Sequence, residues 1–220
     1  MNENDKKNID QAFGIRSEYI YNPKSFVSSE KSSPHSKCFI AAGRFCKAKG
    51  FDTLVESMSV FTDKVKNWKL YLVGDGDDKP QIEKMIAEKG LTDYIELPGF
   101  SNDIKSYFLK SSVLLLPSRW EGMPMIVLEA LEMGCPIISF DIDAIAPLIS
   151  DGKEGIIVPN EEGANGFAQA MIKISQDDAL REALSEQAIK KSEKFSTDLI
   201  VPKWIRVLSG GENNSYDHND

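Results

Sequence analysis

Short apolar runs alternate with segments whose apolar residues recur at helical spacing, over residues 37–208. The expected strands are 38–42, 69–73, 94–98, 113–116, 136–140 and 155–158. These runs are continuous, which is typical of parallel strands that are buried on both faces. Strands that alternate with helices form a parallel sheet with helices on both faces. The sequence therefore predicts an α/β fold, a Rossmann-like doubly wound sheet of mainly six parallel strands.

The expected helices separate these strands and follow the last one. They are placed at 51–60, from Pro80 onward, at 103–110, 124–134, 164–176, 178–195 and 198–208. The polar residues 1–36 are interpreted as a lead-in, with strand character only at 19–23. Residues 37–208 then form the domain, and the polar tail 209–220 is predicted to be disordered.

Composition excludes several classes of protein. The chain has 220 residues, which fits one large domain or one domain with tails. A net charge of −8 argues against nucleic acid as the main partner. No apolar run approaches the roughly 18 residues of a membrane span, and the polar N-terminus is unlike a secretory signal. Three scattered cysteines indicate reduced thiols and a cytoplasmic location.

Ligands of doubly wound sheets bind at the carboxyl ends of the strands, so the residues there are candidates for a site. Gly43 and Arg44 follow the first expected strand, with Lys49 five residues beyond Arg44. Glycine lets a ligand approach the backbone, and two cations at this spacing can hold a diphosphate. The alternative is ordinary solvated loop charge. Gly74 follows the second strand, where it either lies beside a ligand or only makes a tight turn.

Residues 117–136 join the fourth strand to a helix that is expected to have Pro124 in its first turn and to stop at Gly134. A glycine beside a helix N-terminus leaves N–H groups for an anion, which the helix dipole also favours. Glu121 and Glu129 bracket this helix N-terminus and suit hydroxyl groups, because carboxylates accept hydrogen bonds and repel phosphate. The combination suggests a nucleotide sugar. The alternative is that Glu129 is a solvated helix residue and Glu121 an ordinary cap.

The same stretch resembles the group 1 family of retaining glycosyltransferases, which have the GT-B fold. Glu121 and Glu129 match the family's E-x7-E motif, and residues 118–124 are similar to its S-x-x-E-G-x-P phrase. Residues 43–50 are similar to G-R-x4-K-G, residues 73–76 to V-G-x-G, and residues 97–100 to L-x-G-F. The resemblance implies that this chain is the C-terminal, donor-binding domain. The Tyr-Asn-Pro at 21–23 resembles the end of the linker from the family's N-terminal domain.

The resemblance also assigns roles to residues of this chain. Arg44 and Lys49 would bind the leaving diphosphate, with Glu129 on the ribose hydroxyls and Glu121 as the catalytic residue near the donor sugar. The remaining donor-binding residues would be Gly43, Gly74, Phe100, Gly122, Met123 and Pro124. The backbone at Phe100 would face the nucleobase, although its side chain fits a core position equally well. No cofactor or metal is expected, and the Asp-Ile-Asp string at 141–143 is interpreted as loop.

The implied function is transfer of a sugar from a nucleotide-diphosphate sugar, expected to be a UDP-sugar, to an acceptor hydroxyl with retention. The expected pathway is bacterial surface polysaccharide or lipopolysaccharide synthesis, at the inner face of the membrane in the full-length enzyme. The family's N-terminal acceptor domain is missing from this sequence, so the isolated chain is expected to be inactive. The rival hypotheses are a non-catalytic nucleotide-sugar-binding or regulatory module and a Rossmann oxidoreductase, which the lack of G-x-G-x-x-G disfavours.

Overall fold

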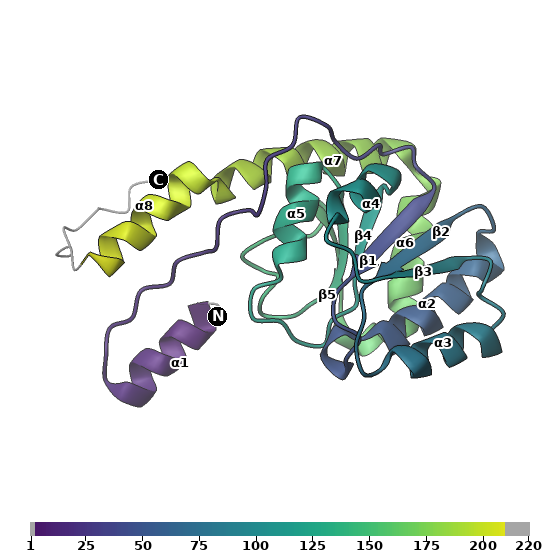
Figure 1. The fold of residues 1–220 in the computed structure, drawn as a ribbon, viewed down its shortest axis with the longest axis horizontal. Coiled ribbons are helices and arrows are strands. Elements are labelled where there is room, and N and C mark those ends of the chain that lie inside the picture. The colour runs from purple at the N-terminus through teal and green to yellow at the C-terminus, as the bar shows by residue number, and fades with distance from the viewer. Residues whose placement is uncertain (1–2, 210–220) are drawn as a thin grey trace.

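The computed structural model describes residues 3–209, and its centre is a single sheet of parallel strands (Figure 1). The strand order is β3-β2-β1-β4-β5-β6, and every neighbouring pair is parallel. The strands are β1 (Cys38–Ala42), β2 (Lys69–Val73), β3 (Ile95–Gly99), β4 (Val113–Leu116), β5 (Ile137–Phe140) and β6 (Gly155–Val158). The predicted six-stranded, doubly wound α/β fold is confirmed.

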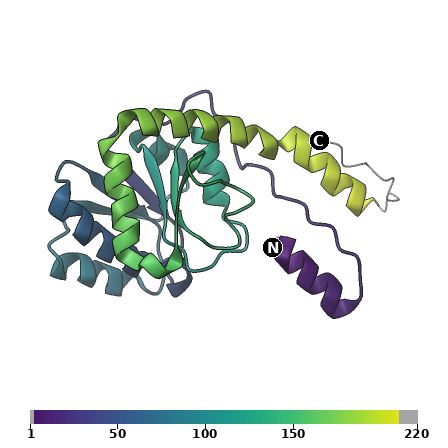
Figure 2. The ribbon, with the colours of Figure 1, turned by 180° about the vertical axis from the view of Figure 1, so that it is seen from behind.

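Helices cover both faces of the sheet. The connection β1–α2–β2 and the connection β4–α5–β5 run in opposite directions along the sheet. Because such crossovers are right-handed, their helices lie on opposite faces. α6 packs against α2, and α7 packs against α5 (Figures 1 and 2). The helices are α2 (Phe51–Lys64), α3 (Lys79–Glu88), α4 (Ile104–Lys110), α5 (Met125–Met133), α6 (Gly163–Gln176) and α7 (Asp178–Ser192).

The strand order creates a switch point between β1 and β4. The chain leaves β1 toward β2 on one side, and it leaves β4 toward β5 on the other. The loops that follow these strands therefore diverge and open a crevice at the carboxyl edge of the sheet. Both strands are deeply buried, with Phe39, Ile40 and Leu114 fully inaccessible to solvent. The crevice is thus built on strands that lie in the core of the domain.

The lead-in differs from its prediction. Residues 3–13 form helix α1 (Glu3–Phe13), which was not expected, and residues 19–23 form no strand. Within α1 the i,i+4 ion pair between Lys6 and Asp10 supports the helix, a signal that apolar periodicity does not register. The rings of Tyr19 and Tyr21 pack edge to face at 4.7 Å, so the aromatic residues that suggested a strand pack on each other instead.

The last described helix, α8 (Thr197–Leu208), confirms the helix expected at 198–208 and projects away from the sheet (Figures 1 and 2). An ion pair between Arg206 and Glu18 joins it to the lead-in, and Trp204 Nε1 donates to the carbonyl of Tyr21 at 3.1 Å. The expected disordered tail lies outside the described residues, except for Ser209. Within residues 3–209, no helix combines the length and the apolar character that crossing a membrane requires.

Candidate functional site

The loops after β1, β2, β3 and β4 surround a cavity of about 660 Å³ at the carboxyl edge of the sheet. This volume is typical of a small-molecule site. Every predicted site residue except Gly122 lines the cavity, namely Gly43, Arg44, Lys49, Gly74, Phe100, Glu121, Met123, Pro124 and Glu129. The sequence did not single out other lining residues, among them Ser101, Asn102, Ile104, Met125 and Ile126.

Two glycines let the ends of β1 and β2 come together under the cavity. The Gly43 N–H donates to the carbonyl of Val73 at 3.0 Å. A Cβ at Gly74, where φ is 142°, would lie 1.9 Å from the carbonyl oxygen of Gly43. Any side chain there would force the two backbones apart. Gly74 is therefore needed for the close approach of the two backbones beside the cavity, and not only for the turn after β2.

Lys49 and Glu121 meet inside the cavity. Lys49 Nζ lies 2.6 Å from Glu121 Oε1, and Ser118 Oγ donates to the same oxygen at 2.7 Å. The two side chains are 22% and 9% exposed. Glu121 is therefore neither solvated nor a helix cap. The sequence assigned Lys49 and Glu121 to different parts of a ligand, and the structure adds that the cation also fixes the acid.

Arg119 attaches the loop after β4 to the short 3-10 helix η1 (Lys47–Lys49). Its backbone N–H donates to the carbonyl of Ala48 at 2.8 Å, and its guanidinium binds both oxygens of Asp52 at 2.8 and 2.7 Å. Burial raises the pKa of Asp52, but the hydrogen bonds from Arg119 and from backbone N–H groups, together with the positive charge of Arg119, outweigh burial and lower the pKa. Arg119 thereby holds together the two segments that carry Lys49 and Glu121, a role that its place in the motif did not indicate.

Arg44 and the start of α5 add positive character to the cavity. The exposed side chain of Arg44 has no hydrogen-bond or ion-pair partner among residues 3–209. Helix α5 begins at Met125, so Pro124 immediately precedes the first turn instead of lying in it as predicted. No side chain caps this helix, and Met125 and Ile126 line the cavity. An anion in the cavity would thus meet a guanidinium, an ammonium and a helix N-terminus.

Glu129 and Glu132 lie three residues apart on α5, and only the first lines the cavity. The Ser25 hydroxyl donates to Glu129 Oε1 at 2.7 Å. Burial raises the pKa of Glu129, and the hydrogen bond from Ser25 lowers it by less, so the net shift is upward. Glu129 is thus half-buried at the cavity wall and has a hydrogen-bond partner, unlike the freely solvated helix residue of the alternative. The sequence missed both Ser25 and the buried Glu132, which lie in no motif.

Phe100 is 72% exposed and lines the cavity, so the alternative of a core phenylalanine is wrong. An aromatic side chain at this position offers a flat surface to a ligand ring. The residues Asp141 and Asp143 lie in the loop after β5, as interpreted, and do not line the cavity. Within the described part of the chain, no three His, Cys, Asp or Glu side chains come together as metal ligands.

Comparison with known proteins places this chain in a family. The family model for group 1 glycosyl transferases matches residues 25–191. The amylovoran biosynthesis glycosyltransferase AmsD of Erwinia amylovora is 27% identical over 218 residues, which cover 95% of this chain and 61% of that protein. A variant of S. aureus TarM, solved with fondaparinux, α-GlcNAc-glycerol and UDP, has a TM-score of 0.83 at 25% identity and covers 98% of this chain and 43% of that one.

The C-terminal domain of LpcC from Francisella tularensis, a group 1 family protein, shares the fold at a TM-score of 0.66 and 22% identity, over 81% of this chain and 97% of that one. The chain spans about half or less of the first curated relatives it matches, with shares of 54%, 19% and 38%. The family match includes all six strands and every residue that lines the cavity. The chain therefore belongs to the group 1 glycosyltransferases, and its sheet is a Rossmann-like domain of the GT-B fold.

Proposed function

We propose that this chain is the donor-binding domain of a retaining glycosyltransferase that uses a nucleotide-diphosphate sugar. The observation that carries the proposal is the composition of the cavity. Two cations and an uncapped helix N-terminus suit a diphosphate, and two carboxylates beside them suit the hydroxyls of ribose and sugar. UDP is the expected nucleotide, because the TarM complex of the same fold contains UDP. That complex also contains an α-linked GlcNAc-glycerol, which supports retention.

The proposed role of each residue follows from its charge. Arg44, Lys49 and the N-terminus of α5 would bind the diphosphate and stabilise the negative charge that develops on it as the sugar leaves. Glu129 would accept hydrogen bonds from ribose, and the aromatic face of Phe100 would contact the base. Glu121, held by Lys49 and Ser118, would face the donor sugar. Charge stabilisation at the diphosphate is thus assigned to protein groups, and we expect no metal cofactor.

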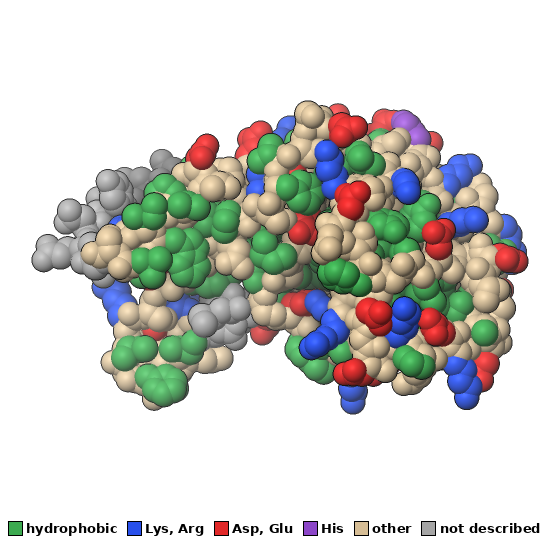
Figure 3. Space-filling model, viewed as in Figure 1, with side chains coloured by type: hydrophobic (Ala, Val, Ile, Leu, Met, Phe, Trp, Pro, Cys, Tyr) green, Lys and Arg blue, Asp and Glu red, His purple; other side chains and the backbone are tan. Residues whose placement is uncertain are grey.

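We further propose that a second, N-terminal domain supplies the acceptor site. The chain spans only 54%, 19% and 38% of the first curated relatives it matches, which supports a partner domain. In this proposal residues 1–36 connect to that domain, and residues 37–208 bind the donor. Helix α8 carries an apolar surface away from the sheet, visible in Figure 3, that another domain can cover. Its exposed apolar residues are Leu199, Trp204, Ile205, Val207 and Leu208.

The expected acceptor is a carbohydrate or lipid-linked hydroxyl in the synthesis of a bacterial surface polysaccharide or lipopolysaccharide. The likeness to a protein of amylovoran biosynthesis supports this class. We propose that transfer takes place in the cytoplasm, at the inner face of the membrane in the longer enzyme. The three cysteines, all described and all unpaired, are in keeping with a reducing compartment.

The donor proposal predicts selective stabilisation by a nucleoside diphosphate. UDP at about a hundredfold its Kd should stabilise the chain by about 2.7 kcal/mol, which raises the melting temperature of a domain of this size by roughly 5–10 °C. Uridine should give a much smaller shift at the same concentration, because it lacks the diphosphate. A thermal melt with UDP, uridine and UDP plus EDTA measures this. Equal shifts from uridine and UDP would contradict the diphosphate site, and loss of the shift with EDTA would contradict metal independence.

The partner-domain proposal predicts that residues 1–220 bind a UDP-sugar but do not transfer the sugar to an acceptor. Fusion to the N-terminal domain of a close relative should restore transfer, which product chromatography can follow. The Glu121→Gln variant of the same fusion should fold and transfer the sugar more slowly. Transfer by residues 1–220 alone would overturn the proposed division between domains. Binding without transfer in every fusion would favour the non-catalytic binding module.

A further inference from the structure

A segment outside the motifs that form the candidate site lies along helix α5 next to that site. We call residues 22–32 the strap; it precedes the first strand of the sheet. The backbone N–H of Lys24 donates to the carbonyl of Phe195 at 2.8 Å. At the other end, the backbone N–H of Ser32 donates to the carbonyl of Met133 at 2.8 Å. The strap is therefore attached to the domain at both ends.

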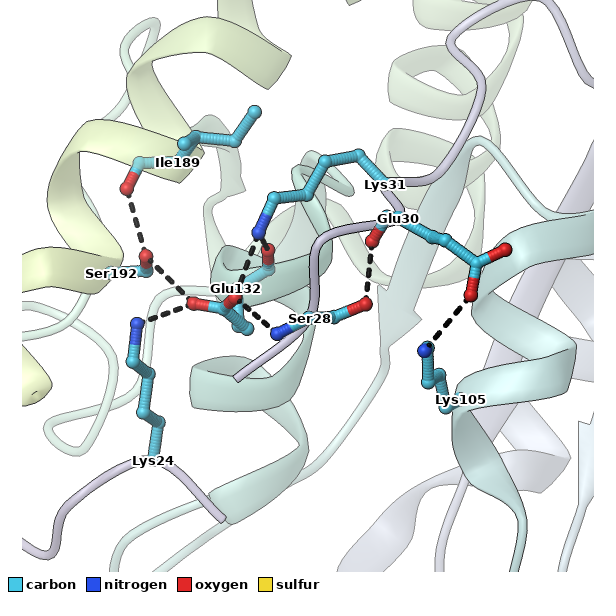
Figure 4. A network of polar contacts seen from close by, with 8 residues as sticks. All are labelled: Lys24, Ser28, Glu30, Lys31, Lys105, Glu132, Ile189 and Ser192. Carbon is cyan, nitrogen blue, oxygen red and sulfur yellow. Dashed lines mark hydrogen bonds and ion pairs between the residues drawn. The ribbon is translucent and has the colours of Figure 1, made fainter. Parts of the chain in front are cut away.

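The middle of the strap is held by Glu132, as Figure 4 shows. Lys24 Nζ forms an ion pair with Glu132, Lys31 Nζ lies 2.7 Å from Oε1, and the Ser28 N–H donates to Oε1 at 2.9 Å. The acid is only 2% exposed. Burial raises the pKa of Glu132, but the hydrogen bonds from Lys24, Lys31 and Ser28 outweigh it and lower the pKa to about 2. An ionised, buried acid therefore fixes the position of the strap on α5.

The strap also contacts the wall of the cavity. Ser25, next to Lys24, donates its hydroxyl to Glu129 Oε1 at 2.7 Å. The backbone N–H of Asn22 lies 3.3 Å from the sulfur of Met123, and its side-chain amide lies 3.6 Å from the sulfur of Met125. Glu129, Met123 and Met125 all line the cavity. Two strap residues thus contact three lining residues, from more than 100 positions away in the sequence.

The two acids of α5 receive different hydrogen-bond donors from the strap. Glu132 receives two lysine ammonium groups, which use its capacity to accept hydrogen bonds. Glu129 receives one neutral hydroxyl, on Oε1. An ionised carboxylate has about four acceptor positions on its two oxygens, so Glu129 keeps most of its capacity for a ligand. The hydroxyl orients the carboxylate without neutralising its charge.

We propose that Ser25 is a positioning residue of the donor site. Its hydroxyl holds Glu129 in the orientation in which the carboxylate accepts hydrogen bonds from the ribose hydroxyls of a nucleoside diphosphate. The inference rests on the proposed donor function and adds the strap to it. Removal of the hydroxyl leaves Glu129 able to rotate, and the ordering of its side chain then opposes binding.

The hydrogen bond from Ser25 also affects the pH range in which Glu129 is charged. Burial raises the pKa of Glu129, and Ser25 lowers it. Without the hydroxyl the pKa of Glu129 rises further, so the carboxylate is protonated at a higher pH. The charged groups that line the cavity, Arg44, Lys49, Asp75 and Glu121, are the same in every variant of Ser25. A difference in pH dependence between such variants therefore reports on Glu129.

The test is calorimetric titration of UDP into residues 1–220 over the pH range in which carboxylates titrate. Ser25→Ala should weaken UDP about threefold to tenfold at neutral pH, as expected for one lost hydrogen bond, and its affinity should decline at a higher pH than that of the wild type. Ser25→Thr keeps a hydroxyl and should restore both properties. Ser29→Ala, at an exposed position of the same strap, should match the wild type. The protonation of the diphosphate changes with pH in the same way for every variant, so it does not produce a difference between variants.

The outcomes separate this inference from the function on which it rests. If the wild type binds UDP and Ser25→Ala matches Ser29→Ala in affinity and pH profile, the positioning role is overturned and the donor site stands. Weaker binding with an unchanged pH profile would also overturn it, because the strap would then act only through shape. If the wild type does not bind UDP, both proposals fail. Melting temperatures measured alongside show whether each variant is folded.

Discussion

Replacement of Glu132 by glutamine is expected to lower the free energy of unfolding by about 3 kcal/mol, because loss of one partner leaves buried charges uncompensated. Lys24 Nζ is the group most affected, since its side chain is 8% exposed. For a domain of this size the loss corresponds to roughly 6–12 °C in melting temperature. Denaturant unfolding of the wild type and Glu132→Gln measures the difference.

Glu30→Gln is the matched control. Glu30 lies on the same strap and forms an ion pair with Lys105 at 3.1 Å, but its side chain is 67% exposed (Figure 4). Exposed ion pairs contribute up to about 1 kcal/mol, so this variant should stay within that range of the wild type. Equal losses from Glu30→Gln and Glu132→Gln would show that the buried position of Glu132 does not matter.

The stabilisation by Glu132 should depend on pH. Its pKa is lowered from 4.5 to about 2 in the folded chain. A group with a lowered folded pKa stabilises the fold fully above its unfolded pKa, and this contribution is lost as the pH falls toward the folded value. The difference in stability between wild type and Glu132→Gln should therefore be constant above pH 4.5 and should shrink between pH 4.5 and about 2. A difference that does not change over this window would contradict the assigned pKa.

The second large effect is on the ligand. Glu129→Gln should weaken UDP about tenfold or more, because a hydrogen bond to a charged group contributes roughly 1.5–3 kcal/mol. If Glu129 binds ribose as proposed, its contacts exist equally in the bound donor and in the transition state, so the loss should appear in Michaelis constants and not in turnover. Calorimetric titration of UDP and a UDP-sugar, with kinetics of the two-domain fusion, measures both quantities.

Glu121→Gln is the informative comparison for Glu129→Gln. Glu121 is assigned to the sugar, which UDP lacks, so this variant should leave UDP affinity almost unchanged. The structure adds that Lys49 pairs with Glu121 at 2.6 Å, so the substitution also releases a cation toward the diphosphate. Turnover of the UDP-sugar should fall in the fusion. If Glu121→Gln weakened UDP as much as Glu129→Gln, the proposed division between sugar and ribose would be wrong.

The sheet and the location of the site could be predicted from the sequence because both follow from local signals. A continuous apolar run indicates a buried strand, and the carboxyl ends of parallel strands meet at one edge by construction. Gly43, Gly74, Phe100 and Glu121 could thus be placed near one another before their loops were known. The lead-in could not be predicted in this way, because α1 contains an i,i+4 ion pair that apolar periodicity does not register, and Tyr19 packs on a neighbouring ring.

What the sequence by itself determined is the order of strands and helices, the loops at the carboxyl edge and the residues that these loops bring to the cavity. Only the tertiary structure decided which side chains in and around the cavity bind one another. Lys49 pairs with Glu121 across 72 positions, Arg119 with Asp52 across 67, and Ser25 with Glu129 across 104. Partners so far apart produce no periodic pattern in the sequence, because hydrogen bonds and ion pairs depend on where packed elements place their side chains. Glu129 and Glu132 lie on the same helix, and the same packing gives them different partners and different exposure to the cavity.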